Sequence, residues 1–232
     1  MKNVLVVSAL PQETDYIDEY LKDKPQWQKQ NEGEFINADK DIHLHVRVLG
    51  VGKVNAAFQT ADAINDVQPE LIVNVGVAGG LADDLDRGAV AIGTDYVQVD
   101  MKTLLPENSP VIESTPDYIL EGILEVAKAN NITYRAGRIA TGDFVLYERR
   151  KRRAIKKEFN PIAFDMETAA VAQVATAKKI DFVGIRSFSD MANKKTIGLL
   201  SKKENVKASE KSLRETILMT PAKLIIDYLE ND

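Results

Sequence analysis

Short apolar runs of strand length recur along the chain, and longer segments with apolar residues at helical spacing separate them. The runs "VLVVSA" (4–9) and "LIVNVGVA" (71–78) are apolar at almost every position, which is typical of central strands that are buried on both faces. The pattern predicts strands at Val4–Ala9, Ile42–Leu49, Leu71–Val75, Ala89–Ile92, Tyr134–Thr141, Ile162–Phe164 and Phe182–Ser187.

The intervening segments predict helices that alternate with these strands. Their expected bounds are Glu13–Leu21, Lys53–Asn65, Pro116–Ala129, Tyr147–Glu158, Thr168–Ala177 and Lys207–Glu230. Pro221 falls inside the last of them and should kink it, because proline cannot donate the helical hydrogen bond. We therefore expect an α/β fold over residues 1–232 as a single domain, with a central, mixed or mostly parallel twisted sheet flanked by helices.

Composition places the chain among ordinary globular proteins, with 232 residues, 44% of them hydrophobic and 28% charged. No apolar run is long enough for a membrane span, and the short apolar stretch after Lys2 is better explained by a first strand than by a signal peptide. Cysteine is absent, which excludes disulfides, thiolate metal sites and a cysteine nucleophile, and makes the cytoplasm the expected compartment.

The charged residues argue against two further classes of function. The two histidines, His43 and His45, alternate along a predicted strand, so we interpret them as strand residues and expect no metal site. A net charge of −5 disfavours a nucleic-acid partner. The exception is Glu148–Glu158, with seven basic residues in eleven; it lacks interleaved aromatic residues, so a solvated helix face is favoured over an RNA-binding patch.

Carboxylates and glycines follow the predicted strands, at the edge of the sheet where α/β proteins bind ligands. The carboxylates are Glu13, Glu167 and Asp190. The glycine turns at 50–52 and 76–80 match neither G-x-G-x-x-G nor a P-loop, so phosphate binding is weakly supported. Three acids at one edge of the sheet, without a histidine cluster, predict acid/base chemistry on a neutral, polyol-like substrate.

Six segments, in the same order along essentially the whole chain, resemble the 5′-methylthioadenosine/S-adenosylhomocysteine nucleosidases of the nucleoside phosphorylase superfamily. They are "VVSALPQE", "GVGKVNAA", "NVGVAGGL", "TGDFVL", "DMETAAVA" and "IRSFSD". The resemblance implies a nucleoside phosphorylase-like fold and hydrolysis of both nucleosides to adenine and the thio-ribose. It also implies that no metal or organic cofactor is needed, that the binding partner is a small-molecule purine nucleoside, and that the chain forms a homodimer whose partner subunit closes the 5′ pocket.

The same resemblance assigns the catalytic and ribose-binding residues. Asp190 would give a proton to N7 of adenine, and Glu13 would position and activate the attacking water. Glu167 would accept hydrogen bonds from the ribose hydroxyls, with Met166 packing under the sugar. For Asp190 to carry a proton near neutral pH, its pKa must rise from about 3.9 towards 7, which burial and a nearby carboxylate could achieve.

Residues on the purine side are assigned in the same way. The backbone of Leu146 would read the purine edge, while Phe144 and Val145 would line its pocket. Ser189 and Arg186 would hold Asp190 in place.

Three departures from the family pattern leave the identity of the substrate open. Val77, a candidate substrate-binding residue, stands where many relatives carry a small hydroxylated residue. Asp165, expected to support Glu167, replaces a more usual glutamate. The segment 99–110 differs from the aromatic, glycine-containing loop of the best-known members. All three lie near the sugar and its 5′ pocket.

Other functions compete with hydrolysis of these two nucleosides. A phosphorylase would need cations beside the ribose; the first turn offers Pro11–Glu13 instead, and Lys53 and Arg47 are the only cations nearby in the sequence. A hydrolase of another nucleoside, such as futalosine, remains open. A non-catalytic nucleoside-binding protein is disfavoured, because it would need neither the acid nor the base.

Overall fold

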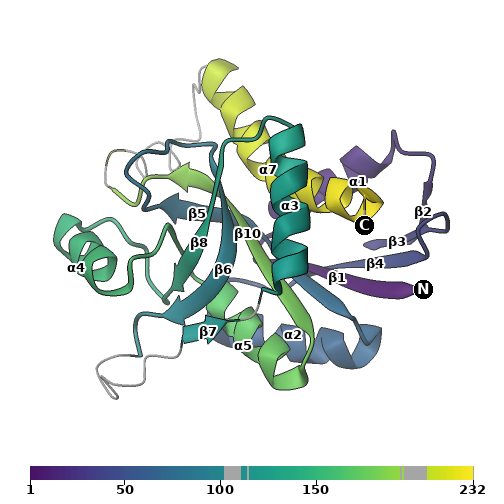
Figure 1. Ribbon diagram of the computed structural model, residues 1–232, viewed down its shortest axis with the longest axis horizontal. Coiled ribbons are helices and arrows are strands. Elements are labelled where there is room, and N and C mark those ends of the chain that lie inside the picture. Colours follow the sequence, from purple (N-terminus) through teal and green to yellow (C-terminus); the bar gives the residue numbers. More distant parts are fainter. Residues whose placement is uncertain (102–110, 114, 194, 196–207, 232) are drawn as a thin grey trace.

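All strands of this computed structural model, which describes residues 1–101, 111–113, 115–193, 195 and 208–231, belong to one ten-stranded sheet (Figure 1). The strands are β1 (Lys2–Ser8), β2 (Trp27–Asn31), β3 (Glu34–Asn37), β4 (Ile42–Val48), β5 (Leu71–Gly80), β6 (Val90–Gln98), β7 (Val111–Glu113), β8 (Tyr134–Thr141), β9 (Ala163–Asp165) and β10 (Asp181–Asp190). They follow the order β10-β6-β8-β9-β5-β1-β4-β3-β2, and β7 pairs with β6.

The sheet closes on itself because β10 pairs with β5 as well as with β6. The sequence predicted a mixed or mostly parallel sheet, and of these two the mixed sheet is found. Antiparallel pairs are as numerous as parallel ones, so the sheet is mixed. The short turns at 32–33 and 38–41 reverse the chain between β2 and β3 and between β3 and β4. Strand β7 pairs antiparallel with β6, and closure brings β6 and β9 alongside strands that run the other way.

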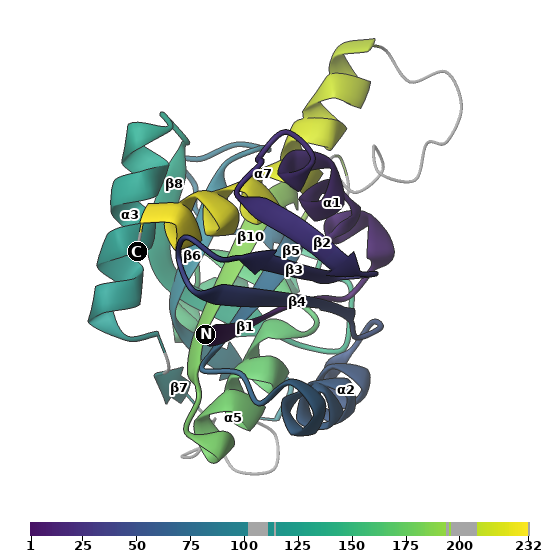
Figure 2. The ribbon, with the colours of Figure 1, turned by 90° about the vertical axis from the view of Figure 1, so that its right-hand side faces the viewer.

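Helices cover both faces of the sheet (Figures 1 and 2). The helical segments are η1 (Pro11–Glu13, a single 3₁₀ turn), α1 (Asp15–Leu21), α2 (Lys53–Val67), α3 (Asp117–Ala129), α4 (Arg149–Phe159), α5 (Thr168–Lys178) and α7 (Ala208–Asn231). Helices α1, α3 and α7 share one hydrophobic core with the sheet, whereas α2 and α5 share the other. Helix α4 packs through Ile155 and Phe159 into a smaller third cluster.

Strand β1 shows how one sequence run serves both cores. Val4 and Val6 point into the core beneath α1, α3 and α7, and Leu5 and Val7 point into the core beneath α2 and α5. All four side chains are fully buried. The prediction that this apolar run forms a central strand is therefore confirmed, since alternate residues of a strand face opposite sides.

Most predicted elements are present with small shifts at their ends, but three strands are longer than predicted. Strand β5 continues to Gly80, β6 to Gln98 and β10 to Asp190. Their last residues are glycines and polar residues, which favour turns in isolation but remain in the sheet because strands of the closed ring pair with them. The prediction missed β2, β3 and β7.

Helix α7 is 24 residues long and contains Pro221. It changes direction along its length in both ribbon views, as the proline predicted (Figures 1 and 2). Neither α7 nor another helix in the described part of the chain is both long and apolar enough to cross a membrane.

Tyr96 fills the sheet face beneath α5 and gives a first test of the fold. It is fully buried, its hydroxyl accepts a hydrogen bond from the backbone N–H of Gly184 at 2.8 Å, and the Thr115 hydroxyl lies 2.8 Å away. Tyr96→Phe should lower the free energy of unfolding by about 1–3 kcal/mol, because it leaves a buried N–H unpaired. Chemical denaturation would measure the loss.

Tyr118→Phe is the matched control for this substitution. The Tyr118 side chain is 55% exposed, and its hydroxyl bonds to Asp181 at the surface. Its loss should change the free energy of unfolding by less than about 0.5 kcal/mol. Equal losses in the two variants would contradict a structural role for the buried hydroxyl.

Candidate active site

A cavity of about 200 Å³ lies where β1, β5, β9 and β10 end. The three carboxylates predicted from the sequence all reach it. Its lining comprises Ala9, Leu10, Glu13, Val51, Val77, Ala78, Gly79, Phe144, Val145, Leu146, Phe164, Asp165, Met166, Glu167, Ser189, Asp190 and Ala192. Among the predicted site residues only Arg186 is not part of the lining.

Glu13 sits in η1, immediately after β1, and its carboxylate is held by backbone donors. Oε2 accepts hydrogen bonds from the N–H groups of Ala9 and Leu10 at 3.0 and 2.9 Å. Oε1 accepts one from the N–H of Val77 at 3.0 Å. The side chain is buried. The turn after β1 and the glycine-containing end of β5 therefore fix the direction of this carboxylate together.

Gly76 makes that arrangement possible. A Cβ at this position would lie 2.5 Å from Glu13 Oε1 and 2.5 Å from Arg186 Nη1, and its φ of +152° is also one that side chains rarely adopt. Glycine is required here because a carboxylate and a guanidinium both approach the backbone closely.

Glu167 precedes α5, and its Oε1 accepts a hydrogen bond from the N–H of Gly52 at 2.9 Å. Gly52 precedes α2 with a φ of +93°, so the glycine turn after β4 contacts the carboxylate through its backbone. Burial, followed by the nearby charge of Asp165, raises the pKa of Glu167 to about 7, although Arg186 and the Gly52 N–H oppose the shift. Glu167 can therefore exchange a proton near neutral pH.

Asp165 and Arg186 form a fully buried ion pair, with Arg186 Nε 2.8 Å from Asp165 Oδ2. Thr141 donates to Asp165 Oδ1 at 2.6 Å, and Thr168 donates to the other oxygen. The guanidinium also bonds to Asn74 and Thr168. The expectation that Arg186 would hold Asp190 is corrected. The hydrogen bonds of Arg186 go to Asp165, Thr168 and Asn74 instead.

Asp190 ends β10 with its carboxylate held by its own loop. The Ser189 hydroxyl donates to Oδ2 at 2.9 Å, as the sequence suggested, and the Ala192 N–H donates to Oδ1 at 2.6 Å. Burial raises the pKa of Asp190, while those two hydrogen bonds and the charge of Arg87 oppose the shift. A buried carboxylate with a raised pKa is suited to carrying a proton.

The segment after β8 forms an apolar wall of the cavity. Leu146 is buried, Phe144 is half-buried and Val145 is 59% exposed. The ring of Phe144 lies 4.9 Å from that of Phe164, and Lys151 of α4 sits over its face.

Sequence reasoning missed the buried polar residues that support the carboxylates. Asn74 lies in the middle of the apolar β5, and Thr141 and Thr168 flank Asp165. One feature of the sequence pointed to Asn74: an asparagine inside an apolar strand must find a buried partner. The predicted 5′ segment falls largely on residues 102–110, which lie outside the described part of the chain.

Comparison with known proteins decides the family. The model of the phosphorylase superfamily matches residues 3–224. The chain belongs to this superfamily. A 5′-methylthioadenosine/S-adenosylhomocysteine nucleosidase of Staphylococcus aureus is 34% identical to this superfamily member over 163 residues, which cover 66% of this chain and 71% of that protein.

Solved structures show the same fold. The nucleosidase of that name from Campylobacter jejuni gives a TM-score of 0.79 at 26% identity, with 100% of both chains covered. The futalosine hydrolase of Helicobacter pylori gives 0.81 at 22% identity, covering 100% of this chain and 98% of that one. This superfamily member therefore shares its fold with hydrolases of two different nucleosides.

In the described part of the chain, no group of three or more histidine, aspartate or glutamate side chains is placed to hold a metal ion. His43 and His45 lie on β4 with ring centroids 3.9 Å apart and ring planes tilted by 42°, and neither lines the cavity.

The raised pKa of Glu167 predicts a pH-dependent stability. A carboxyl whose folded pKa exceeds its unfolded value stabilises the fold fully below about pH 4.5, and this contribution is lost as the pH rises through about 7. The advantage of Glu167→Gln over the native chain should therefore grow as the pH rises from 5 to 8. The difference in the free energy of unfolding should reach on the order of 3 kcal/mol.

Thermal unfolding at several pH values would measure this difference. Glu121→Gln, at an exposed position of α3, removes the same charge without removing a buried one and serves as the control. An advantage of Glu167→Gln that shrinks as the pH rises would show that the fold stabilises the ionised carboxylate instead.

Proposed function

We propose that this chain is a purine nucleosidase that hydrolyses the N-glycosidic bond of 5′-methylthioadenosine and S-adenosylhomocysteine, giving adenine and the thio-ribose. The named nucleosidase relatives support this activity. The observation that carries it is the set of three carboxylates around one cavity, each held in a different environment.

Two of those environments suit an acid and a base. Asp190 is buried with a raised pKa, so it can hold a proton and deliver it to the purine N7 as the glycosidic bond breaks. Glu13 accepts three backbone hydrogen bonds that fix its direction, so it can orient and deprotonate a water. Cleavage through an oxocarbenium-like state is assisted by such a pair on opposite sides of the bond.

The remaining lining residues suit a nucleoside. Glu167 would accept hydrogen bonds from the ribose hydroxyls, with Met166 packing against the sugar. The backbone of Leu146 would read the purine edge beside the apolar walls of Phe144 and Val145. Val77 contributes its backbone N–H to Glu13 and its side chain to the cavity, so it would bound the space around the sugar and the water.

Water, rather than phosphate, is supported as the attacking group by the cations near the cavity. The described lining residues include no lysine or arginine. Lys53 and Arg47, the nearby cations of the sequence, are paired: Lys53 with Asp100 at 2.7 Å, and Arg47 with Glu34 at 3.3 Å. A phosphate dianion would find no compensating charge among these residues.

Futalosine, or another purine nucleoside with a different 5′ substituent, is the second candidate substrate. The futalosine hydrolase of Helicobacter pylori has the same fold as this chain. The residues around the purine and ribose suit either nucleoside, so the choice between them rests on the 5′ pocket.

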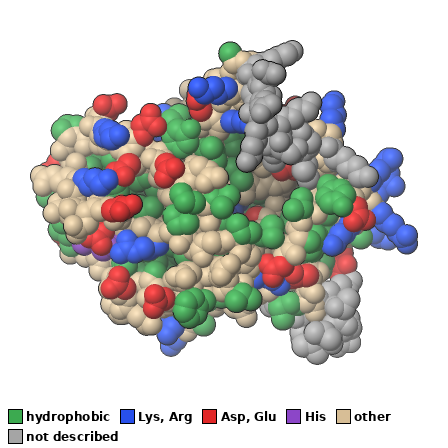
Figure 3. Space-filling view, turned by 180° about the vertical axis from the view of Figure 1, so that it is seen from behind, with side chains coloured by type: hydrophobic (Ala, Val, Ile, Leu, Met, Phe, Trp, Pro, Cys, Tyr) green, Lys and Arg blue, Asp and Glu red, His purple; other side chains and the backbone are tan. Residues whose placement is uncertain are grey.

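A homodimer is proposed from the exposed apolar surface beside the cavity. Val54 and Phe58, one turn apart on α2, are 79% and 67% exposed, and Val51, just before this helix, lines the cavity. Hydrophobic side chains gather round a hollow on the face shown in Figure 3. Exposed apolar side chains of this size mark an interaction surface, and a second copy would cover them.

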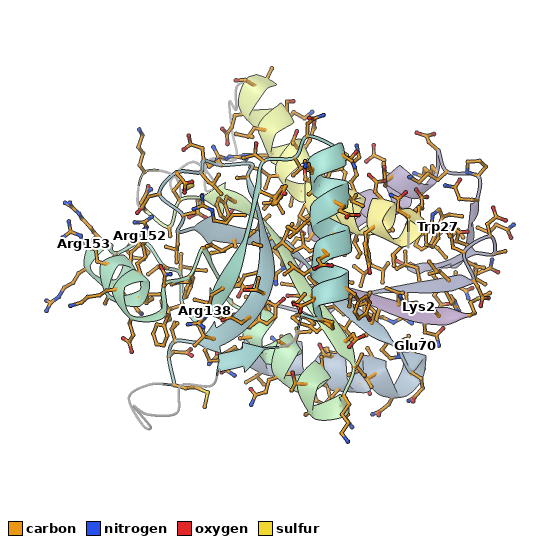
Figure 4. The ribbon with its side chains drawn as sticks, in the orientation of Figure 1. Lys2, Trp27, Glu70, Arg138, Arg152 and Arg153 are labelled. Carbon is orange, nitrogen blue, oxygen red and sulfur yellow. The ribbon has the colours of Figure 1, made fainter. Side chains whose placement is uncertain are left out.

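We further propose a cytoplasmic, single-domain enzyme that works without a metal or an organic cofactor and without a nucleic-acid or membrane partner. The lack of cysteine supports the compartment. The basic helix α4 projects Arg152 and Arg153 from one end of the molecule (Figure 4), where Asp83 pairs with Arg152 and Lys156. This pairing supports a solvated helix face rather than an RNA-binding surface.

Adenine release from 5′-methylthioadenosine tests the proposal directly. Chromatography in phosphate-free buffer should detect free adenine and free thio-ribose, with the same rate after phosphate is added. Release that requires phosphate would assign the chain to the phosphorylases. Release from futalosine alone would transfer the activity to the second candidate substrate.

Asp190→Asn tests the role of the acid. The variant keeps the size of the side chain but cannot donate a carboxylic proton, so kcat should fall by about 10²- to 10⁴-fold. Calorimetric binding of 5′-methylthioadenosine should persist, which separates catalysis from binding. Full turnover by this variant would exclude Asp190 as the general acid.

A further inference from the structure

Strand β10 contains an irregularity immediately before Asp190. Phe188 is in register with Ala78 of β5, and Asp190 is in register with the next residue, Gly79. Ser189 is therefore an extra residue without a partner position in β5. Such a bulge interrupts the ladder and redirects the side chains that follow it, so the direction of Asp190 depends on how the bulge is held.

Arg87, from the loop between β5 and β6, holds the bulge through the backbone. Its Nε donates to the carbonyl oxygen of Ser189 at 2.7 Å. The peptide that begins with this carbonyl also contains the N–H of Asp190, so the contact fixes the orientation of the catalytic residue's own backbone. The hydrogen bonds to the Asp190 carboxylate come from Ser189 and Ala192, within the same segment, and so depend on the same backbone.

Glu210, near the start of α7, fixes Arg87 in turn. Arg87 Nη1 and Nη2 donate to the two Glu210 oxygens at 3.0 and 2.8 Å, a two-pronged contact in which the arginine side chain is only 11% exposed. Arg214, one turn further along α7, contacts Glu210 at 3.3 Å. Two parallel hydrogen bonds to a planar guanidinium specify its orientation as well as its position.

We propose that Arg87 is a positioning residue of the nucleosidase and that Glu210 fixes the orientation of Arg87. Helix α7 then holds the general acid in place through the contact of Arg87 with the Ser189 carbonyl. This inference rests on the proposed function. The positive charge of Arg87 also acts on Asp190: it favours the carboxylate that remains once the proton has passed to the purine, and it opposes the rise in pKa that burial causes.

The test compares two leaving groups. Adenine must be protonated to leave, whereas p-nitrophenolate leaves a 5-methylthioribofuranoside without protonation. Arg87→Lys keeps the charge but cannot bond to Ser189 and both Glu210 oxygens at once. It should lower kcat for 5′-methylthioadenosine by about 10- to 100-fold, part of what a general acid contributes. KM, and kcat for the p-nitrophenyl substrate, should change less than about threefold.

Glu210→Gln should show the same selectivity with a smaller loss, since one carbonyl oxygen still accepts from Arg87. Glu230→Gln is the matched control, because it removes a half-buried carboxylate that contacts Lys24 and Trp27 at the other end of α7. It should lower the melting temperature without changing the ratio of the two rates.

The outcomes separate this inference from the proposed function. Two results, if found in both Arg87→Lys and Glu210→Gln, would overturn the positioning role. One is an equal fall in kcat for the two substrates, and the other is an unchanged kcat for 5′-methylthioadenosine. A native chain that releases no adenine from 5′-methylthioadenosine would contradict the proposed function instead. If Arg87→Lys does not fold, Glu210→Gln gives the same comparison.

Discussion

The buried ion pair between Asp165 and Arg186 is the interaction on which the candidate site depends. A guanidinium buried in a protein is costly unless carboxylates and hydrogen bonds compensate it. Burial lowers the pKa of Arg186, but Asp165, Glu13 and Glu167 outweigh that effect, so its pKa lies above the ordinary value. The same positive charge allows three acidic side chains to gather in one small space.

The pKa values of Glu167 and Asp190 are both raised, but their charged neighbours differ. Glu167 lies close to Asp165, and this like charge adds to burial in raising its pKa. Asp190 lies beyond the bulge, where Arg87 is the cation that influences it and burial dominates. The fold places a different cation near each of these two groups: Arg186 acts on Glu167, and Arg87 acts on Asp190.

The sequence predicted the elements and the gathering of the carboxylates because both follow from short-range patterns. A continuous apolar run specified β1, and the rule for ligand sites at strand ends brought Glu13, Glu167 and Asp190 together. The pairing of Arg186 was mispredicted because proximity in sequence favoured Asp190. The structural reason is the extra residue at Ser189, which breaks the alternation after Phe188. A bulge depends on the partner strand, so a single strand's pattern cannot reveal it.

Long-range contacts explain what else the sequence left open. Strand β10 carries the charge that balances Asp165 and Glu13 and, four residues later, the candidate acid. Arg186 is held by Asn74 of β5 and by Thr168 at the start of α5, whereas Asp190 is held through Arg87 by Glu210 of α7. Damage to the ion pair should therefore affect folding and ribose binding together, because Glu167 and the core share it. Damage at Arg87 should affect the proton transfer, because the bulge separates Asp190 from the ion pair of Asp165 and Arg186.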